Sequence, residues 1–382
     1  MSFPVRPPVS YKGEFPTYAQ PAEITSYSID HNRQVWFDDR ELKYYYPPNG
    51  KDLYVGFDKF IKRDESIPEH IDTLLDALTN ARQKASNPQL AQADIVTWRG
   101  IMTKIMCTPT TRNEPWMLRA TRHKNTIYIE EQAMDEKKRN EADLPIKEQM
   151  QCYGGYRFET LCTLSKPPSK VQKGDPELLQ RLNDSADTNI QYCVVVKTKL
   201  GKNSLIMGAE VDCSRDVKRV GEKSNPLQNY VELKTSRLIE NSRHQSSFER
   251  FKLKKFWAQS FLVGVPRVIC GFRDDQGLVQ SVEEFKTMEI PRMVRNKPGL
   301  WEPVVCLRFA NEFLDWLQTV VVEDDPTVTY IIEWKAPWHE ITIRKESIPQ
   351  PFITQRYIDG ETSHEIGGPR VSSSTSSYKS LE

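Results

Sequence analysis

The spacing of apolar and polar residues along the chain predicts three amphipathic helices and a set of strands. Apolar residues recur at helical spacing over residues 66–86, 246–262 and 308–321. Ser66 and Glu69, at the start of the first segment, predict a capping box there. Because helices and strands mix without a regular βαβ repeat or a glycine-rich phosphate loop, the sequence predicts a mixed α+β domain. Apolar runs bounded by turn residues predict strands over residues 126–131, 191–200, 205–213, 229–236, 267–274 and 327–335.

Two of the predicted strands each carry a pair of charged residues two positions apart. Glu210 and Asp212 form the first pair, and Glu232 and Lys234 form the second. Side chains at positions i and i+2 of a strand share a face, so each strand directs both of its charges to the same side. If the two strands are neighbours in one sheet, three carboxylates and one ammonium group crowd a single face.

Crowded carboxylates of this kind indicate a bound cation. Two like charges about 4 Å apart repel by roughly 4 kcal/mol at an effective dielectric constant near 20. Oxygen ligands without His or Cys suit Mg²⁺ or Mn²⁺. An acid pair followed by acid-x-Lys is also the core pattern of a broad class of metal-dependent nucleases. The alternative interpretation is solvated charge on half-exposed strands, which is the commoner role of such residues.

Two neighbouring stretches carry further candidate residues. Glu159 lies among apolar residues in the segment 154–162, which we expect to be helical. It is either a desolvated metal ligand or the polar edge of an amphipathic helix. Lys255 and Gln259 are four apart, so they share one helix face. That face either grips a phosphodiester or simply faces solvent.

Composition limits the classes of partner. The chain has 382 residues and a net charge of +1, which is not the strongly basic profile of a protein that coats long nucleic acid. Any nucleic acid should therefore be gripped at a local site, such as a chain end. The seven cysteines are odd in number and contain no C-x-x-C pair, which favours a reducing compartment over disulfides or structural zinc. No apolar run approaches the roughly 18 residues that span a bilayer, so we expect no membrane association.

The same patterns divide the chain into three parts. Residues 1–22 are rich in Pro and Tyr, which predicts an extended arm lying on the domain. Residues 23–355 form a single predicted domain, in which 165–185 reads as a surface loop with a short helix. Residues 356–382 end in low-complexity polar sequence, which predicts a largely disordered tail.

Five motifs together resemble a known family. They occur in the family's order and spacing, and the likeness runs from about residue 25 to about residue 340. The family is the DXO family of RNA 5′-end decapping and pyrophosphohydrolase proteins, and the chain most resembles its fungal nuclear members, which are partners of a 5′→3′ exoribonuclease. The motifs are TWRG (97–100), GYRFE (155–159), GAEVD (208–212), YVELKTS (230–236) and KFWAQSFLVGVP (255–266).

The resemblance implies two twisted mixed β-sheets flanked by helices, with a D/E-x-K nuclease-like active-site cleft. It implies hydrolysis at RNA 5′ ends that carry a triphosphate, an incompletely methylated cap or an NAD cap, with Mg²⁺ or Mn²⁺ as cofactor, expected as two ions. Lys234 and Gln259 match the groups near the scissile phosphate and the attacking water. Residues matching the metal ligands are Glu159, Glu210, Asp212, Glu232 and the carbonyl group of Leu233, and residues matching the stretch that contacts the 5′ phosphates are Trp98, Arg99 and Gly100.

Three further positions match the family's substrate contacts less closely. Cys193 matches a substrate-contacting cysteine, but it also reads as a small buried hydrophobic residue. Glu69 matches a substrate-contacting acid, although it is also the predicted capping partner of Ser66. Arg33 is a further candidate contact.

The expected function is therefore that of an RNA 5′-end phosphohydrolase that also binds and stabilises the nuclear 5′→3′ exoribonuclease. One alternative is a mainly non-catalytic activator that retains the fold for partner binding. Another is the cytoplasmic branch of the family, a decapping 5′→3′ exoribonuclease without this partner. The expected location is the nucleus, with the cytoplasm as the alternative.

Overall fold

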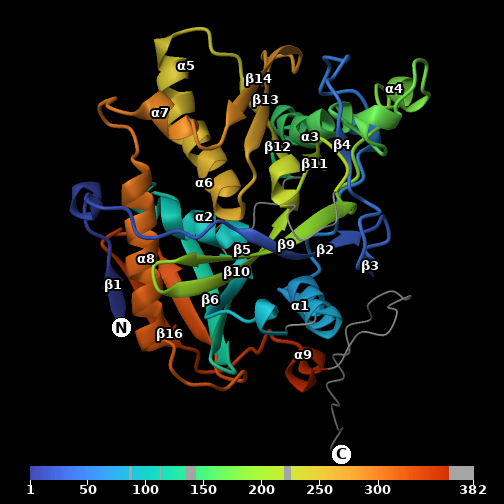
Figure 1. Cartoon of the computed structure of the whole chain (residues 1–382). Helices are drawn as coiled ribbons and strands as arrows, with labels where there is room; N and C mark the ends of the chain where they lie inside the picture. The colour runs from blue at the N-terminus through green and yellow to red at the C-terminus, as the bar shows by residue number, and fades with distance from the viewer. Residues whose placement is uncertain (86–87, 112, 135–142, 219–224, 361–382) are drawn as a thin grey trace, which may run out of the picture.

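Two β-sheets organise the chain (Figure 1). The computed structural model describes residues 1–85, 88–111, 113–134, 143–218 and 225–360. The larger sheet contains, in spatial order, β1 (Ser2–Pro4), β16 (Glu340–Lys345), β15 (Tyr330–Trp334), β6 (Trp116–His123), β7 (Thr126–Gln132), β5 (Ile95–Trp98), β10 (Asn203–Glu210), β9 (Gln191–Leu200), β2 (Ala22–Ile29) and β3 (Val35–Trp36). The smaller sheet contains β14 (Val279–Lys286), β13 (Arg267–Arg273), β12 (Tyr230–Arg237), β11 (Cys213–Ser214), β4 (Tyr44–Tyr45) and β8 (Thr163–Leu164).

Both sheets mix parallel and antiparallel neighbours. In the larger sheet, β5 runs parallel to β7 and to β10, whereas β9 and β10 are antiparallel. In the smaller sheet, β12 runs parallel to β13 and antiparallel to β11. The predicted α+β class with two mixed sheets is confirmed. The helices are α1 (Asp72–Lys84), α2 (Arg99–Cys107), α3 (Ile146–Leu161), α4 (Glu177–Gln180), α5 (Ser242–Ser247), α6 (Leu253–Val263), α7 (Ile290–Val294), α8 (Pro303–Val320) and α9 (Gln355–Asp359).

Helices cover both faces of the larger sheet. On one face, α1 and α9 pack in a hydrophobic cluster that includes Leu74 and Val195, and on the other, α2, α6 and α8 form the main core with Val194 (Figure 1). Neighbouring residues of β9 thus face different helices, and a strand buried on both faces reads as a continuous apolar run. A third cluster joins α3 to the smaller sheet, where Phe158 lies with Leu233.

The predicted N-terminal arm lies along the domain and adds a strand to it. β1 pairs antiparallel with β16 at the edge of the larger sheet. Phe3 is buried against α8, with ring centroids 5.8 Å from Phe309 and 5.7 Å from Phe313. A 3₁₀ turn follows at Pro8–Tyr11, and the Tyr11 ring is also buried against Phe309. Apolar anchoring therefore fixes the path of this segment.

The predicted capping box is wrong. Helix α1 begins at Asp72, and its N-cap residue, Ile71, makes no side-chain cap bond. Ser66 instead donates to Asp64 in a turn before the helix. Glu69 also lies before α1, where it binds arginine side chains. Ser66 and Glu69, whose spacing resembles a capping box, therefore make their contacts in the loop before α1.

The helix over 246–262 is more complex than its periodicity predicts. It consists of α5, a π-helical turn at Phe248–Lys252 and α6. α6 ends at Val263 and is capped by Gly264, which adopts the left-handed conformation with φ of 76°. The predicted surface loop at 165–185 contains a 3₁₀ turn and the short α4, as expected.

The C-terminal boundary predicted at residue 356 falls inside α9. Arg356 forms a bidentate ion pair with Asp76 of α1, with N···O distances of 2.8 and 2.7 Å. Tyr357 is buried, and its hydroxyl group meets Tyr128 at 2.8 Å and Arg82 at 2.7 Å. The first residues of the predicted tail are therefore part of the folded domain, whereas 361–382 lie outside the described residues.

This packing predicts that α9 stabilises the domain. Tyr357→Ala removes a buried ring and two hydrogen bonds, so we expect it to lower the free energy of unfolding by about 3 kcal/mol or more. Gln355→Ala, on the exposed side of the same helix, is the matched control and should change it by less than about 0.5 kcal/mol. Urea unfolding of both variants measures the difference. Equal stabilities would show that α9 contributes nothing to the core.

Candidate active site

The candidate site lies where the chain passes from the larger sheet to the smaller one. Glu210 is the last residue of β10, and Asp212 immediately precedes β11. β11 then pairs with β12, in the register Cys213 opposite Val231. The sequence leaves open whether the two charged strands are neighbours in one sheet: β10 and β12 belong to different sheets, and only Cys213, at the end of the predicted strand 205–213, pairs with β12 through β11. The two-residue passage between β10 and β11 is what brings the acids together.

The second charged pair shares one face of β12, as its spacing predicts. The Nζ atom of Lys234 lies 2.6 Å from Oε1 of Glu232. The alternate residues Val231 and Leu233 point to the opposite face, where they join the cluster under α3. Strand alternation thus separates the apolar anchor of β12 from its charged face.

Arg99 completes this charged group from the larger sheet. It is the first residue of α2, directly after β5, and its Nη1 atom lies 2.8 Å from Oε2 of Glu232. The Glu232 side chain is only 2% exposed. Burial alone would raise the pKa of Glu232, but the charges of Arg99 and Lys234 lower it to about 2. Glu232 is therefore a buried, ionised carboxylate held by two cations.

The other carboxylates are less well neutralised. Asp212 accepts a hydrogen bond of 2.6 Å from the backbone N–H of Leu233. Burial, and then the charge of Glu232, raise the pKa of Asp212 to about 7. Glu159 projects from α3, and burial together with the charges of Asp212 and Glu210 raises its pKa well above the ordinary value. These carboxylates repel one another, so the site favours a proton or a cation.

A hydrogen-bond chain connects Glu210 to two of the predicted substrate contacts. Gln191 donates to Glu210 at 3.2 Å and accepts from Arg33 at 2.8 Å. Arg33 in turn binds both carboxylate oxygens of Glu69, at 2.7 and 2.8 Å. The backbone of Arg33 is left-handed, with φ of 63°, which a non-glycine residue rarely adopts. Arg63 also donates to Glu69, at 3.3 Å.

Gln191 and Arg63 were missed by the sequence analysis. Gln191 is the first residue of β9, and Arg63 lies in a loop. Neither belongs to a charged pair with strand or helix spacing, so periodicity carries no signal for them. The contacts that bring them to the site are long-range and appear only in the fold.

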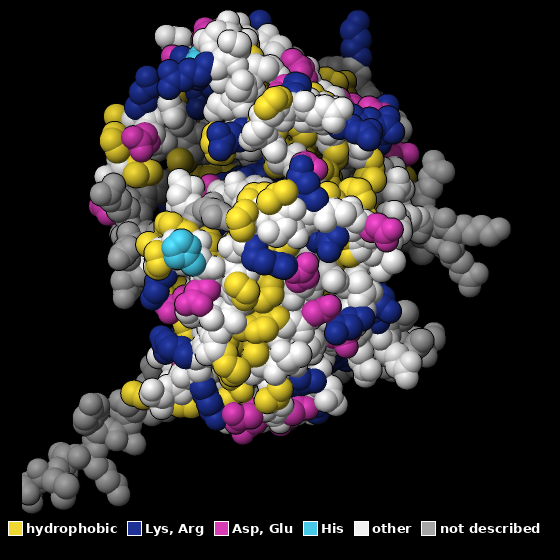
Figure 2. Space-filling view, turned by 90° about the vertical axis from the view of Figure 1, so that its left-hand side faces the viewer, with side chains coloured by type: hydrophobic (Ala, Val, Ile, Leu, Met, Phe, Trp, Pro, Cys, Tyr) yellow, Lys and Arg dark blue, Asp and Glu magenta, His cyan; other side chains and the backbone are white. Residues whose placement is uncertain are grey.

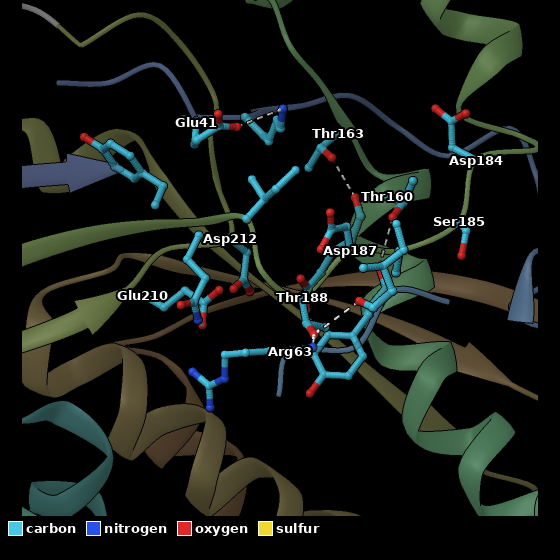
Figure 3. Close-up of a pocket in the computed structure, with 18 of the residues that line it drawn as sticks. Glu41, Arg63, Thr160, Thr163, Asp184, Ser185, Asp187, Thr188, Glu210 and Asp212 are labelled. Atoms are coloured by element: carbon cyan, nitrogen blue, oxygen red, sulfur yellow. Dashed lines mark hydrogen bonds and ion pairs between the residues drawn. The ribbon is translucent and has the colours of Figure 1, made fainter. Parts of the chain in front are cut away.

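A cavity of about 710 Å³ opens beside the carboxylates. Glu159, Glu210 and Asp212 line one side of it. Figure 3 shows Glu210 and Asp212 together on one side, with Asp184 and Ser185 on the other. A polar cavity that meets three acids can admit a charged, extended ligand to them.

The remaining candidate residues divide into those that support the site and those that lie apart from it. Trp98 packs over Gly208, where any Cβ would lie 2.6 Å from its ring, which explains why glycine precedes the acid pair. Gly100 lies in the first turn of α2 and is exposed. Gln259 is half-buried on α6, which packs against α2. The Lys255 side chain is exposed and pairs with Glu114 at 3.1 Å.

Cys193 is opposite Glu210 in the β9–β10 ladder, but its side chain is buried in the cluster beneath α1. Burial, and then the charge of Glu210, raise the pKa of its thiol to about 12. It does not line the cavity. The structure therefore buries the Cys193 side chain as a small hydrophobic residue, and its contact with substrate stays a prediction.

The donor set fits a hard divalent cation. Glu159, Glu210, Asp212 and Glu232 offer carboxylate oxygens, and burial, followed by the charges of neighbouring carboxylates, raises the pKa of the first three. Within the described ranges, no three Asp, Glu, His or Cys side chains are already grouped as metal ligands. Arg99 and Lys234 already bind the two carboxylate oxygens of Glu232, so a metal ion at Glu232 would share these oxygens with them.

Acids at a sheet junction followed by Glu-x-Lys on the next strand are the arrangement of the D/E-x-K nucleases. Comparison with known proteins gives the family: residues 19–358 match the RAI1-like PD-(D/E)XK nuclease model, and the chain belongs to that family. It is a hydrolase of the nuclease class.

Two curated relatives and one solved structure illustrate the likeness. The chain is 41% identical to the decapping nuclease RAI1 of Neurospora crassa over 329 residues, covering 85% of this chain and 78% of the relative. It is 35% identical to the decapping and exoribonuclease protein of Xenopus laevis over 358 residues, covering 90% and 86%. The crystal structure of Candida albicans Rai1 in complex with pU5 and Mn²⁺ matches with a TM-score of 0.84 and 28% identity, covering 94% of this chain and 98% of that one.

The raised pKa of Asp212 predicts a pH-dependent stability in metal-free buffer. Folded Asp212 holds its proton up to about pH 7, whereas an unfolded Asp releases it near pH 4. The folded state therefore binds more protons between these values, and the wild-type protein should lose stability as the pH rises from about 4 to about 7. Asp212→Asn retains the acceptor for Leu233 and should show a smaller loss.

Thermal unfolding of both proteins in excess chelator across this pH range checks the prediction. Asp58→Asn, which changes an exposed acid on the 3₁₀ turn Phe57–Lys59, is the control and should follow the wild-type curve. If Asp212→Asn also follows the wild-type curve, the pKa of Asp212 in the folded protein is not raised.

Proposed function

We propose that this protein is a metal-dependent hydrolase of RNA 5′ ends. Its proposed substrates carry a 5′-triphosphate, an incompletely methylated cap or an NAD cap. The observation that carries the proposal is the acid cluster, in which Glu159, Glu210 and Asp212 line a polar cavity while Arg99 and Lys234 bind the neighbouring Glu232. Support also comes from relatives named as decapping nucleases and from the related Rai1 complex with pU5 and Mn²⁺.

The proposed metal ligands are carboxylates from three elements and one backbone carbonyl group. They would hold Mg²⁺ or Mn²⁺, and we propose two ions. When bound, such ions stabilise charge on phosphate oxygens and lower the pKa of a coordinated water. The proposed ligands are Glu159, Glu210, Asp212, Glu232 and the carbonyl group of Leu233.

The cationic residues of the site act on the phosphates in this proposal. Lys234 holds its ammonium group at Glu232, beside the acids, where it stabilises negative charge that develops on phosphorus-bound oxygens. Arg99 uses one N–H group on Glu232, and its other guanidinium donors are directed to terminal phosphates. Trp98 and Gly100 flank Arg99 and position it, and Gln259 contributes an amide near the attacking water.

Recognition in this proposal is local to the 5′ end. The net charge is +1, and Figure 2 shows Lys and Arg side chains interspersed with Asp and Glu on the face it presents. A chain of this composition does not attract long RNA by net charge. Of the helices in the described ranges, none is long and apolar enough to cross a membrane. Arg33 and Glu69 are proposed to contact the substrate from the far end of the Gln191 hydrogen-bond chain.

We also propose that the protein binds and stabilises a nuclear 5′→3′ exoribonuclease and acts with it in RNA quality control and ribosomal RNA processing. The proposed location is the nucleus. The support is the resemblance to the fungal nuclear branch of the family, together with the 41% identity to the Neurospora relative.

The first test is hydrolysis of 5′-triphosphate RNA and of RNA with an unmethylated cap. We expect product with Mg²⁺ or Mn²⁺ and none in excess chelator. Glu210→Gln removes one charge from the site, and we expect at least about a hundredfold lower kcat. Glu283→Gln, an exposed acid on β14, is the control and should retain activity. Full turnover in chelator, or by Glu210→Gln, would exclude the proposed mechanism.

The second test is partner binding by purified proteins. We expect the exoribonuclease to co-elute with the wild-type chain and equally with Glu210→Gln, because a single acid in the cavity does not alter the fold. Co-elution with no hydrolysis by the wild type would identify a non-catalytic activator. Hydrolysis with no co-elution would instead place the protein in the branch that lacks the partner.

A further inference from the structure

The cavity has a further wall, beside Glu159, whose other residues the proposed mechanism does not use. This wall consists of the 57–63 segment, in which Lys59 and residues 61–63 line the cavity, and of Tyr156 on α3. Ile61 is tied to the chain beyond it by two backbone hydrogen bonds, from its N–H to Ala186 at 3.1 Å and from Thr188 to its carbonyl oxygen at 3.0 Å. Arg63 adds a third, to the Thr188 hydroxyl group at 2.9 Å. The wall is therefore preformed.

An aromatic side chain stands on this wall, next to the acids. Tyr156 lies one turn before Glu159 on α3, so the two side chains share a helix face, and both line the cavity. The Tyr156 side chain is 39% exposed. A large aromatic residue that is exposed inside a polar cavity, rather than on the outer surface, is the feature that needs an explanation.

The Tyr156 ring is supported from behind. Phe60 stacks on it, with ring centroids 5.8 Å apart and an interplanar angle of 29°. Phe60 in turn meets the edge of Tyr153, at 5.1 Å and 62°. The hydroxyl group of Tyr153 donates to the carbonyl oxygen of Val55 at 2.6 Å, which ties α3 to the chain just before the 57–63 segment. A fixed aromatic face has little conformational entropy to lose when a ligand packs on it.

The charges on this wall largely cancel. Lys62 lies 3.5 Å from Glu65, and Arg63 lies 3.3 Å from Glu69. Lys59 also lines the cavity, but so do acids, including Asp184 and Asp187 of the loop that Ile61 binds. The wall thus has little net positive charge with which to bind a phosphate backbone. Its distinctive chemistry is the aromatic ring beside an exposed Ile61.

We propose that Tyr156 is a stacking site for a nucleobase of the substrate, which it holds while the adjoining phosphate lies at the acids. The inference rests on the proposed function and adds a base-binding residue to it. Stacking on an aromatic ring is indifferent to base identity, because every base has a π face. Tyr156 therefore gives affinity for a nucleotide without imposing a sequence.

The base has two sources. It belongs either to the nucleoside that leaves with the cap or to the RNA chain that remains. A 5′-triphosphate RNA has no base on the leaving side, whereas RNA with an unmethylated guanosine cap has one. Steady-state kinetics on these two substrates therefore separates the sources.

The kinetic test uses Tyr156→Leu, which retains an apolar side chain but removes the ring, and Tyr156→Phe, which retains the ring. We expect Tyr156→Leu to raise KM about tenfold with little change in kcat, and Tyr156→Phe to resemble the wild type. Phe15→Ala, which removes an exposed aromatic ring outside the cavity, is the matched control and should leave KM unchanged. A KM effect on capped RNA alone identifies the leaving nucleoside, and an effect on both substrates identifies the RNA chain.

A binding measurement without turnover completes the test. Short RNAs carrying 2-aminopurine in the cap-side or the first chain position are titrated with protein in excess chelator. We expect wild type and Tyr156→Phe to quench the fluorescence at one of these positions, and Tyr156→Leu to lose the quenching. Unchanged KM and unchanged quenching in Tyr156→Leu would overturn the inference, as would a lower melting temperature with wild-type KM.

These outcomes separate the inference from the function on which it rests. If Tyr156→Leu behaves as wild type while Glu210→Gln is inactive, only the stacking site is lost. If Glu210→Gln retains full activity, the proposed function fails, whatever Tyr156 does.

Discussion

The active site depends on one buried carboxylate that is shared by two cations. Glu232 lies on the smaller sheet and Arg99 follows a strand of the larger sheet, so their ion pair joins the two sheets where the chain passes between them. Lys234 occupies the second oxygen. Removing one partner of a buried ion pair costs about 3–5 kcal/mol, because the remaining charge is left uncompensated. The same interaction therefore holds the junction together and sets the position of the neighbouring acids.

The balance of charges around Glu232 explains why the site favours the binding of a cation. The acids Glu159, Glu210, Asp212 and Glu232 face the cations Arg99 and Lys234. Four carboxylates against two cations leave two formal negative charges, which is the charge that one divalent ion neutralises. Burial, and after it the charge of Glu232, raise the pKa of Asp212 to about 7. In the absence of an ion a proton can relieve the excess negative charge, so protons and metal compete for the same oxygens.

Much of the fold could be predicted from the sequence, because periodicity reports which residues are buried. Strand β9 and helix α8 lie close to where their apolar patterns place them. The pairing of Glu232 with Lys234 also follows from spacing alone, since the two residues lie two positions apart on one strand, β12. What could not be predicted depends on topology: β10, which ends at Glu210, and β12 lie in different sheets, and Glu69 binds Arg33 rather than capping a helix. Local patterns do not encode such long-range contacts.

The cavity wall that carries Tyr156 lies beside the acid Glu159 on the same helix, and this arrangement suits a nucleotide substrate. Acids are concentrated at the sheet junction, where the fold compensates them with Arg99 and Lys234. This wall carries Tyr156 and paired charges, so it adds binding surface without adding to the electrostatic imbalance. Since one helix, α3, carries both Glu159 and Tyr156, the acid and the aromatic ring are held in a fixed relation. A ligand that reaches both must therefore present a negative group and a flat apolar one about a helical turn apart, which is the form of a nucleotide.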